Sequence, residues 1–190
     1  MLLIAGVTAS VLIQTMNSMQ QQAVKTSEET IRDISSGLEV THVSGFVAGS
    51  DIDKLAIFVD PIAASNPIDL TYTYIKLSDS TKTVILNYTQ ACFSATVSNG
   101  LFSTINSSNL TDGNYGLLVI RDVDGSCTQT SPIINERDLV VLLVNTTECF
   151  TGISTSTEVE GLVIPEIGMS GVVGFSTPTS YTNTIVDVQP

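Results

Sequence analysis

The sequence predicts an α+β protein, with a long N-terminal α-helix followed by an immunoglobulin-like antiparallel β-sandwich. Residues 1–40 contain no proline and repeat apolar residues at helical spacing. From Val40 onward, short β-branched runs alternate with turn residues, which indicates seven or eight antiparallel strands. No later segment is long enough for the helices of βαβ units. We therefore expect a helix over residues 1–40 and a β domain over residues 41–190.

The helix begins with an uncharged stretch, MLLIAGVTASVLI, which ends at Ile13. A transmembrane helix needs about 20 apolar residues, and a signal peptide would begin with basic residues, whereas the first basic residue here is Lys25. Apolar residues then recur at helical spacing at positions 12, 16, 19 and 23, and again at 31, 34 and 38. A helix of about 37 residues would be about 55 Å long. Its apolar end is therefore expected to project from the β domain and to be buried by another molecule.

Five β-branched runs predict the main strands: KLAIFVDPI, TVILNYT, YGLLVIRD, DLVVLLVN and GLVIPEI. The segments VDGS, TDGN and SNG between them offer glycine at turn positions. Gly37 is expected to end the helix, because glycine is the preferred residue just beyond a helix C-terminus.

Composition narrows the class of protein. The net charge is −12, from 7 basic and 19 acidic residues, which argues against nucleic acid and anionic membrane surfaces as partners. Ser, Thr and Asn are abundant and Trp is absent, a mixture typical of an extracellular β-rich protein. Cys92, Cys127 and Cys149 are far apart in sequence, so they predict either one disulfide with a leftover thiol or three buried free thiols.

Four Asn-x-Ser/Thr sequons also suit an extracellular protein. They begin at Asn87, Asn106, Asn109 and Asn145. Each is expected either to carry an N-linked glycan or to be an unmodified loop.

A search for catalytic motifs finds none, so we expect no enzyme and no catalytic cofactor. The one histidine, His42, is expected to be a polar residue at the junction of helix and sheet. The segment RDVDGSC places Asp122 and Asp124 on a Gly-containing turn. Two interpretations remain open: a structural site for calcium or magnesium, which prefer oxygen ligands, or a hairpin turn whose carboxylates face water.

Several segments together resemble the archaellins, the filament subunits of the archaeal swimming organelle. They are IAGVTASVLIQTMNSMQQQA, SSGLEVTHVSGF, KLAIFVDPIAASNPIDLTYTYIKLSD, GLLVIRDVDGS, INERDLVVLLVN and VIPEIGMSGVVGFSTPTSY. The resemblance covers most of the chain, in the expected order. It implies a type IV pilin-like structural subunit whose hydrophobic helix packs in the core of an extracellular filament, the archaellum, while the β domains form the outer sheath of this rotating propeller. Archaellins are made with a short basic leader, and the apolar stretch here is shorter than theirs. We therefore expect that N-terminal residues are missing from this sequence and that the full apolar segment reaches membrane-spanning length.

The resemblance also implies partners. These are copies of the chain itself or closely related subunits, the membrane before assembly, and the motor and secretion machinery of the archaellum. Small residues let helices approach closely, and an exposed apolar patch usually marks an interaction site. The expected interface residues of the core helix are Leu3, Ala5, Gly6, Ala9, Leu12, Ile13, Met16 and Met19.

The resemblance bears on the β domain as well. Archaellins bind a divalent metal there, which supports the interpretation of Asp122 and Asp124 as ligands of calcium or magnesium, and they carry glycans on exposed sequons. Two alternatives to an archaellin remain. An adhesive pilus subunit of an archaeon would share the helix, and a membrane-anchored enzyme or ligand-binding module would need a polar pocket.

Overall fold

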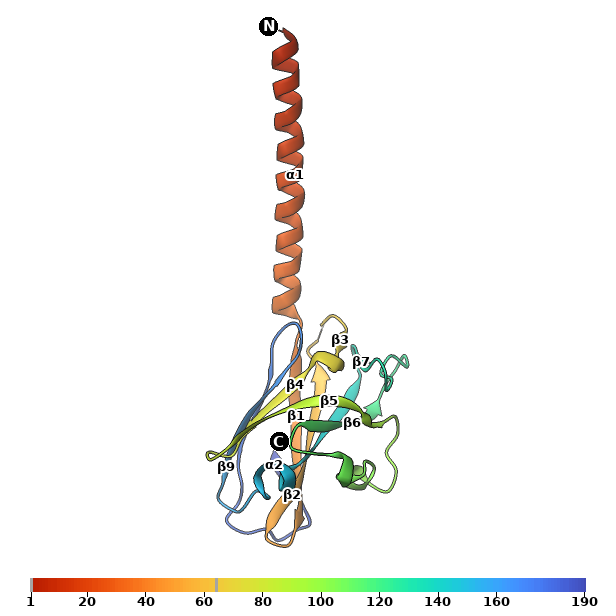
Figure 1. Ribbon diagram of the computed structural model, residues 1–190, viewed down its shortest axis with the longest axis vertical. Helices are drawn as coiled ribbons and strands as arrows, with labels where there is room; N and C mark the ends of the chain where they lie inside the picture. The colour runs from red at the N-terminus through yellow and green to blue at the C-terminus, as the bar shows by residue number, and fades with distance from the viewer. Residues whose placement is uncertain (1, 64) are drawn as a thin grey trace.

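The N-terminal helix stands apart from the strands in the computed structural model, which describes residues 2–63 and 65–190 (Figure 1). Helix α1 (Leu2–Ser35) is unbroken over 34 residues, so it is about 51 Å long at about 1.5 Å per residue. Among the described residues, α1 makes no extensive contact with any strand. The apolar side chains of α1 are therefore left uncovered by the rest of the chain.

The helix ends earlier than the sequence predicts. The apolar stripe predicts a helix to residue 40, whereas Gly37 predicts an earlier end; α1 ends at Ser35, two residues before Gly37, and strand β1 (Leu38–Ala48) begins three residues later. Leu38 has helical spacing from Ile34, so the apolar period runs across the boundary. Hydrogen bonds to distant segments end the helix before Leu38. Ile62 N donates to Gly37 O at 3.0 Å, and Leu38 N donates to Met169 O at 3.0 Å. These tertiary partners replace the helical ones.

The β domain follows the helix and confirms the predicted α+β class. Its other elements are β2 (Asp51–Pro61), β3 (Ile68–Asp69), the 3-10 helix η1 (Leu70–Tyr72), β4 (Tyr74–Ser78), β5 (Thr83–Ser94), the 3-10 helices η2 (Leu101–Ser103) and η3 (Ser107–Asn109), β6 (Asn114–Arg121), β7 (Ile133–Ile134), β8 (Leu139–Asn145), α2 (Thr146–Phe150), β9 (Glu158–Ile164), β10 (Gly171–Ser176) and β11 (Ile185–Gln189).

The strands of the described chain form one large sheet, in the order β10-β9-β4-β5-β6-β8-β2-β1-β11, and a small β3-β7 pair. The main sheet is antiparallel, as predicted, except that β5 and β6 run parallel. A parallel pair needs a long crossover, and here residues 95–113 make it, carrying η2 and η3.

The sheet curls until its two edge strands approach each other. Gln189 of β11 closes the gap with its side-chain amide, because Gly174 N donates to its Oε1 at 2.9 Å and its Nε2 donates to Val172 O at 3.2 Å. The amide thus replaces one step of a backbone ladder between β10 and β11.

Two apolar clusters hold the sheet. The larger lies inside the curl and includes the fully buried Tyr115 and Leu142. The smaller lies on the outer face, where Phe102, Ile105 and Leu110 of the crossover cover part of the sheet. Strand β8 contributes to both clusters, which explains why DLVVLLVN reads as an uninterrupted apolar run rather than an alternating one.

Candidate assembly surface and metal site

The assembly surface that the sequence predicts lies on α1. Four of its expected residues have strongly exposed side chains: Leu12 at 63%, Ile13 at 59%, Met16 at 69% and Met19 at 64%. Gly6 and Ala9 are exposed on the same helix. Leu3 and Ala5 belong to α1, but their side chains lie outside the described residues. Such a run of uncovered apolar side chains is typical of a surface that another molecule buries.

The exposed apolar surface extends beyond the predicted residues. Val7 and Val11 are also more than half exposed, as are Ile31 and Ile34 at the far end of the helix. The sequence could have indicated Val7 and Val11 as interface residues, because nearly every residue around them is apolar on all faces of the helix. Among the described residues, no helix combines the length and apolarity needed to cross a membrane.

The second candidate site is a carboxylate cluster beside β6 and β8. One ligand atom each from Asp122, Asp124 and Asp138 can be chosen so that all three lie within 4.8 Å of one another. Asp138 is fully buried, and its two oxygens accept hydrogen bonds from Val123 N at 3.0 Å and Asn135 N at 2.9 Å. Within residues 2–63 and 65–190, no basic side chain forms an ion pair with these carboxylates.

Backbone donors shape the turn around Asp122. Its Oδ1 accepts from Gly125 N at 2.8 Å, and its Oδ2 accepts from Cys127 N at 3.0 Å. Asn135 Nδ2 donates to Asp124 Oδ2 at 2.8 Å. Hydrogen bonds from Ser126 lower the pKa of Asp124, with Asn135 contributing less. The turn therefore favours the charged form of Asp124.

The sequence predicted two members of this cluster and missed Asp138 and Asn135. Asp138 is brought close because β6 and β8 pair with Arg121 opposite Leu139. That register places the residue after β6 beside the residue before β8. Strand register is not legible in the sequence, so the only available signal was the position of Asp138 directly before an apolar run.

The sequons differ in accessibility. Asn87, Asn106 and Asn109 are exposed. Asn145 is only 8% exposed, and its Nδ2 donates to Leu110 O at 3.2 Å. The nitrogen that would carry a glycan is thus occupied inside the protein.

The three cysteines are all buried and free. Of the two arrangements that the sequence left open, the structure therefore has three buried thiols. Burial raises the pKa of Cys127 to about 12, and the charges of Asp122 and Asp138 add to the effect.

His42 lies in β1, next to Ser44 and facing Asp187 of β11. Its Nε2 is 3.1 Å from Asp187 Oδ1 and 2.9 Å from Ser44 Oγ, while Ser44 Oγ donates to Asp187 Oδ1 at 2.9 Å. In a catalytic triad, the serine and the carboxylate contact different nitrogens of the ring. Here one nitrogen meets both, so the trio acts as a polar clasp between two strands.

Comparison with known proteins matches a family model described as archaeal-type flagellin to residues 1–175. Flagellin B2 of Methanocaldococcus jannaschii is 37% identical over 186 residues, which cover 97% of this chain and 86% of that protein. Flagellin B4 of Pyrococcus abyssi is 36% identical over 203 residues, covering 100% and 92%.

Solved structures agree. The crystal structure of archaeal flagellin FlaB1 from Methanocaldococcus jannaschii matches with a TM-score of 0.74 and 34% identity, covering 81% of this chain and 97% of that chain. The archaeal flagellum of Methanospirillum hungatei matches with a TM-score of 0.65 at 13% identity, over 100% and 92% of the two chains, which shows a shared fold.

Proposed function

Because the chain belongs to the archaeal-type flagellin family, and is thus a structural subunit of the archaellum, an extracellular surface filament, we propose that α1 forms the filament core and that the β domain after it forms the outer sheath. The role of this family is structural. The match to archaeal flagellins favours a subunit of the swimming filament over a subunit of an adhesive pilus. In the proposed arrangement, copies of α1 pack together along the filament axis. The filament then acts as a propeller that is rotated from its base.

The exposure of α1 is the single observation that supports this arrangement. Met16 and Met19 belong to a long run of exposed apolar side chains on α1, and the β domain buries a separate core of its own. A contact between different faces of successive copies builds a helical filament when the rotation between copies does not close a ring. The chain therefore offers an exposed apolar helix that other copies can bury, and a β domain with a core of its own.

Deleting residues 1–23 tests the proposal. The truncated chain should remain folded and monomeric, because the apolar core begins after Ser35. Electron microscopy should show no filaments, and size-exclusion chromatography should show a monomer with the thermal midpoint of the intact β domain. Filaments from the truncated chain would rule out the core role of α1.

We also propose the remaining partners: closely related subunits beside copies of itself, the membrane before assembly, and the motor and secretion machinery of the archaellum. The neutral apolar start of α1 supports the membrane stage, since no charged residue precedes Lys25. A photocrosslinker placed at Val7 in living cells should link the chain to membrane components before assembly and to other subunits after assembly.

For the carboxylate cluster, we propose a structural divalent cation, calcium or magnesium. The donor set fits, because three carboxylates converge without a neutralising cation, and each carboxylate has at least one oxygen that accepts a single hydrogen bond and so keeps a second lone pair. A bound cation would offset the repulsion between Asp122, Asp124 and Asp138 and so hold the turn against β8.

Calcium titration of the chain, kept monomeric in detergent, tests this site. Metal that binds the folded state alone stabilises it by about 2.7 kcal/mol at a concentration 100 times the dissociation constant. The thermal midpoint should therefore rise with calcium, and Asp124→Asn should reduce the rise. Asp112→Asn, an exposed acidic residue outside the cluster, is the matched control. An equal rise in both variants would contradict the site.

We propose N-linked glycans on Asn87, Asn106 and Asn109, and none on Asn145 of the folded chain. Exposure supports the first three, and the hydrogen bond from Asn145 to Leu110 O argues against the fourth. Mass spectrometry of peptides from native filaments should find extra mass at one or more of the first three. A glycan on Asn145 would contradict the assignment.

A further inference from the structure

We propose that α1 is fixed to the β domain by a rigid joint, in which Ser36, Gly37 and Gly168 are positioning residues for assembly. The joint consists of residues 36–38 and the side chains and backbone that grip them: Ile62, Ser65 and Asn66 on one side, and Gly168 and Met169 on the other. Figure 1 shows the two gripping segments on either side of the base of the helix.

On one side, the chain leaving α1 is bonded to the segment before β10. Met169 N donates to Ser36 O at 2.9 Å, and Leu38 N donates to Met169 O at 3.0 Å. These two bonds form a parallel bridge between Gly37 and Met169. The chain that leaves the helix is therefore held by an isolated β-bridge and is not a free loop.

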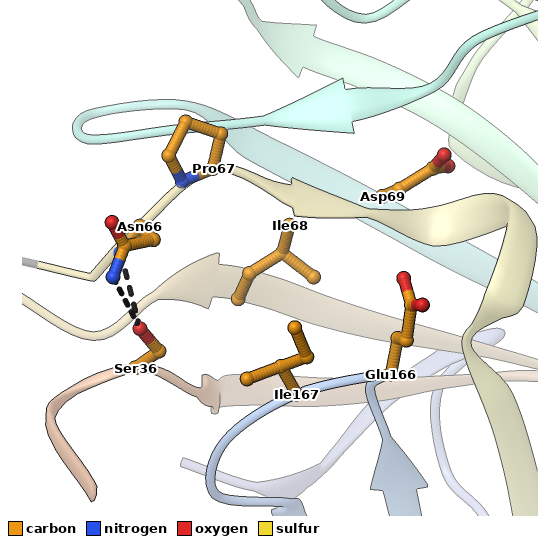
Figure 2. A pocket seen from close by; sticks show the side chains of 7 residues that line it. All are labelled: Ser36, Asn66, Pro67, Ile68, Asp69, Glu166 and Ile167. Atoms are coloured by element: carbon orange, nitrogen blue, oxygen red, sulfur yellow. Dashed lines mark hydrogen bonds between the residues drawn. The ribbon is translucent and has the colours of Figure 1, made fainter. Parts of the chain in front are cut away.

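On the other side, the same residues are bonded to the segment after β2. Ile62 N donates to Gly37 O at 3.0 Å, and Gly37 N donates to Ser65 Oγ at 3.3 Å. Ser36 is 1% exposed, and its Oγ accepts from Asn66 N at 3.2 Å and Asn66 Nδ2 at 3.0 Å, as Figure 2 shows. Both edges of residues 36–38 are thus occupied.

Close backbone approach makes the grip tight. A Cβ on Gly168 would lie 2.2 Å from Ser36 O, and Gly168 has a φ of +96°, which side-chain-bearing residues rarely adopt. A Cβ on Gly37 would lie 2.8 Å from Met169 N and O. Two glycines therefore let three backbone segments meet where no side chain fits.

Apolar packing supports the joint from below. Figure 2 shows Ile167, next to Gly168, facing Ile68 of β3, which is buried. A cavity of about 30 Å³ remains between Ser36, Asn66, Pro67, Ile68, Asp69, Glu166 and Ile167. Ser36 and Asn66 line this pocket together with Ile68 and Ile167, so the joint lies directly against the β domain.

The helix ends at Ser35 and the gripped segment begins at the next residue. No free linker separates the two parts, so the direction of α1 follows the orientation of the β domain. A helical polymer with a single rise and twist requires every copy to present its helix at the same angle. This consequence for assembly depends on the proposed core role of α1, whereas the rigidity of the joint does not.

Pulsed electron–electron double resonance on the full chain in detergent tests the rigidity. Spin labels on cysteines introduced at Thr26 of α1 and Glu160 of β9, both exposed, report the distance across the joint. We expect one narrow distance distribution for the otherwise unchanged chain. Gly168→Ala and Ser36→Ala should broaden or shift it, and Gly174→Ala should not, because a Cβ there meets no atom within 4 Å.

A broad distribution in the otherwise unchanged chain would overturn the rigid joint. A narrow, unshifted distribution in Ser36→Ala would overturn the positioning role of Ser36. That variant removes only one hydroxyl, so it stays informative if Gly168→Ala fails to fold. Rescue by Ser36→Thr, which restores a hydroxyl, would separate the lost hydrogen bonds from a general loss of packing.

Electron microscopy of filaments tests the positioning role. Ser36→Ala and Gly168→Ala should reduce filament yield at least about tenfold or change the helical twist, while Gly174→Ala assembles like the unchanged chain. Wild-type yield and twist in a variant whose distance distribution has broadened would contradict the positioning role. Filaments from the chain without residues 1–23 would instead contradict the core role of α1.

Discussion

At the scale of single residues, the three thiols are the clearest case of environment controlling chemistry. Burial raises the pKa of all three thiols, to about 12 for Cys127 and about 11 for Cys149. Thiolate is the reactive form. We expect Ellman's reagent at pH 8 to modify no cysteine in the folded chain and three after unfolding in guanidinium. A thiol that reacts before unfolding would contradict the burial of that cysteine.

Asp187 gives a second prediction at this scale. Hydrogen bonds from Ser44, and then from His42, lower the pKa of Asp187 below its unfolded value of about 4. A lowered pKa means that the contact stabilises the fold above about pH 4 and is lost as the pH falls through the folded value. Protection factors of β11 amides in hydrogen exchange should therefore drop between pH 5 and pH 3, taken as rough limits around that pKa.

Asp187→Asn removes the titrating group and serves as the control for β11. Its protection factors should be lower than those of the unchanged chain at pH 6 and should vary little on acidification. The same acid-induced loss in Asp187→Asn would assign the effect to another group.

The carboxylate cluster shows how far residue patterns lead. Asp122 and Asp124 share one turn, so their proximity is local and the sequence indicates it. Asp138 joins them only through the pairing of β6 with β8. The two carboxylates of one turn were predictable from adjacent residues in the sequence, whereas the third, which strand pairing brings close, was not.

At the scale of elements, α1 separates folding from assembly. A Cβ on Gly6 would meet no atom within 4 Å in the single chain, so Gly6→Leu has nothing to clash with before assembly. In a packed bundle, added methylenes cost about 1–3 kcal/mol per site, and the cost recurs in every copy. Gly6→Leu and Ala9→Leu should abolish filaments in electron microscopy without moving the thermal midpoint of the β domain.

Glu28→Gln is the matched variant for this experiment, because it changes an exposed residue of α1 outside the predicted interface. It should assemble normally. Normal filaments from both leucine variants would show that Gly6 and Ala9 do not line a packed interface.

Elements were predictable where one period dominates. The helix was found from its apolar spacing, and strands such as β8 from their β-branched runs. The apolar stripe alone places the end of α1 too late, because it continues to Leu38, while hydrogen bonds to Ile62 and Met169 end the helix earlier. Gly37 indicated the end to within two residues. The parallel β5-β6 pair was missed because it depends on a crossover whose sequence reads as ordinary loop.

At the scale of the whole molecule, charge and apolar surface are segregated. The first 24 residues carry no charged side chain, and 16 of the 19 acidic residues follow Ser35, together with five of the seven basic ones. In a filament with α1 at the centre, the core is therefore nearly neutral and the sheath strongly negative. Hydrophobic burial in the core must overcome repulsion between neighbouring β domains.

This segregation predicts how filament stability responds to salt. Repulsion between exposed charges is screened over a Debye length of about 30 Å at 0.01 M salt and about 10 Å at 0.1 M. Filaments should therefore dissociate at a lower temperature in 0.01 M than in 0.1 M sodium chloride, with most of the change complete by about 0.3 M. Light scattering on heating measures the transition.

The chain without residues 1–23 is the control, and its unfolding midpoint should respond less, because it lacks the repulsion between copies. Filaments that become less stable as salt rises toward 0.1 M would show that attraction between opposite charges, rather than apolar burial in the core, holds the subunits together.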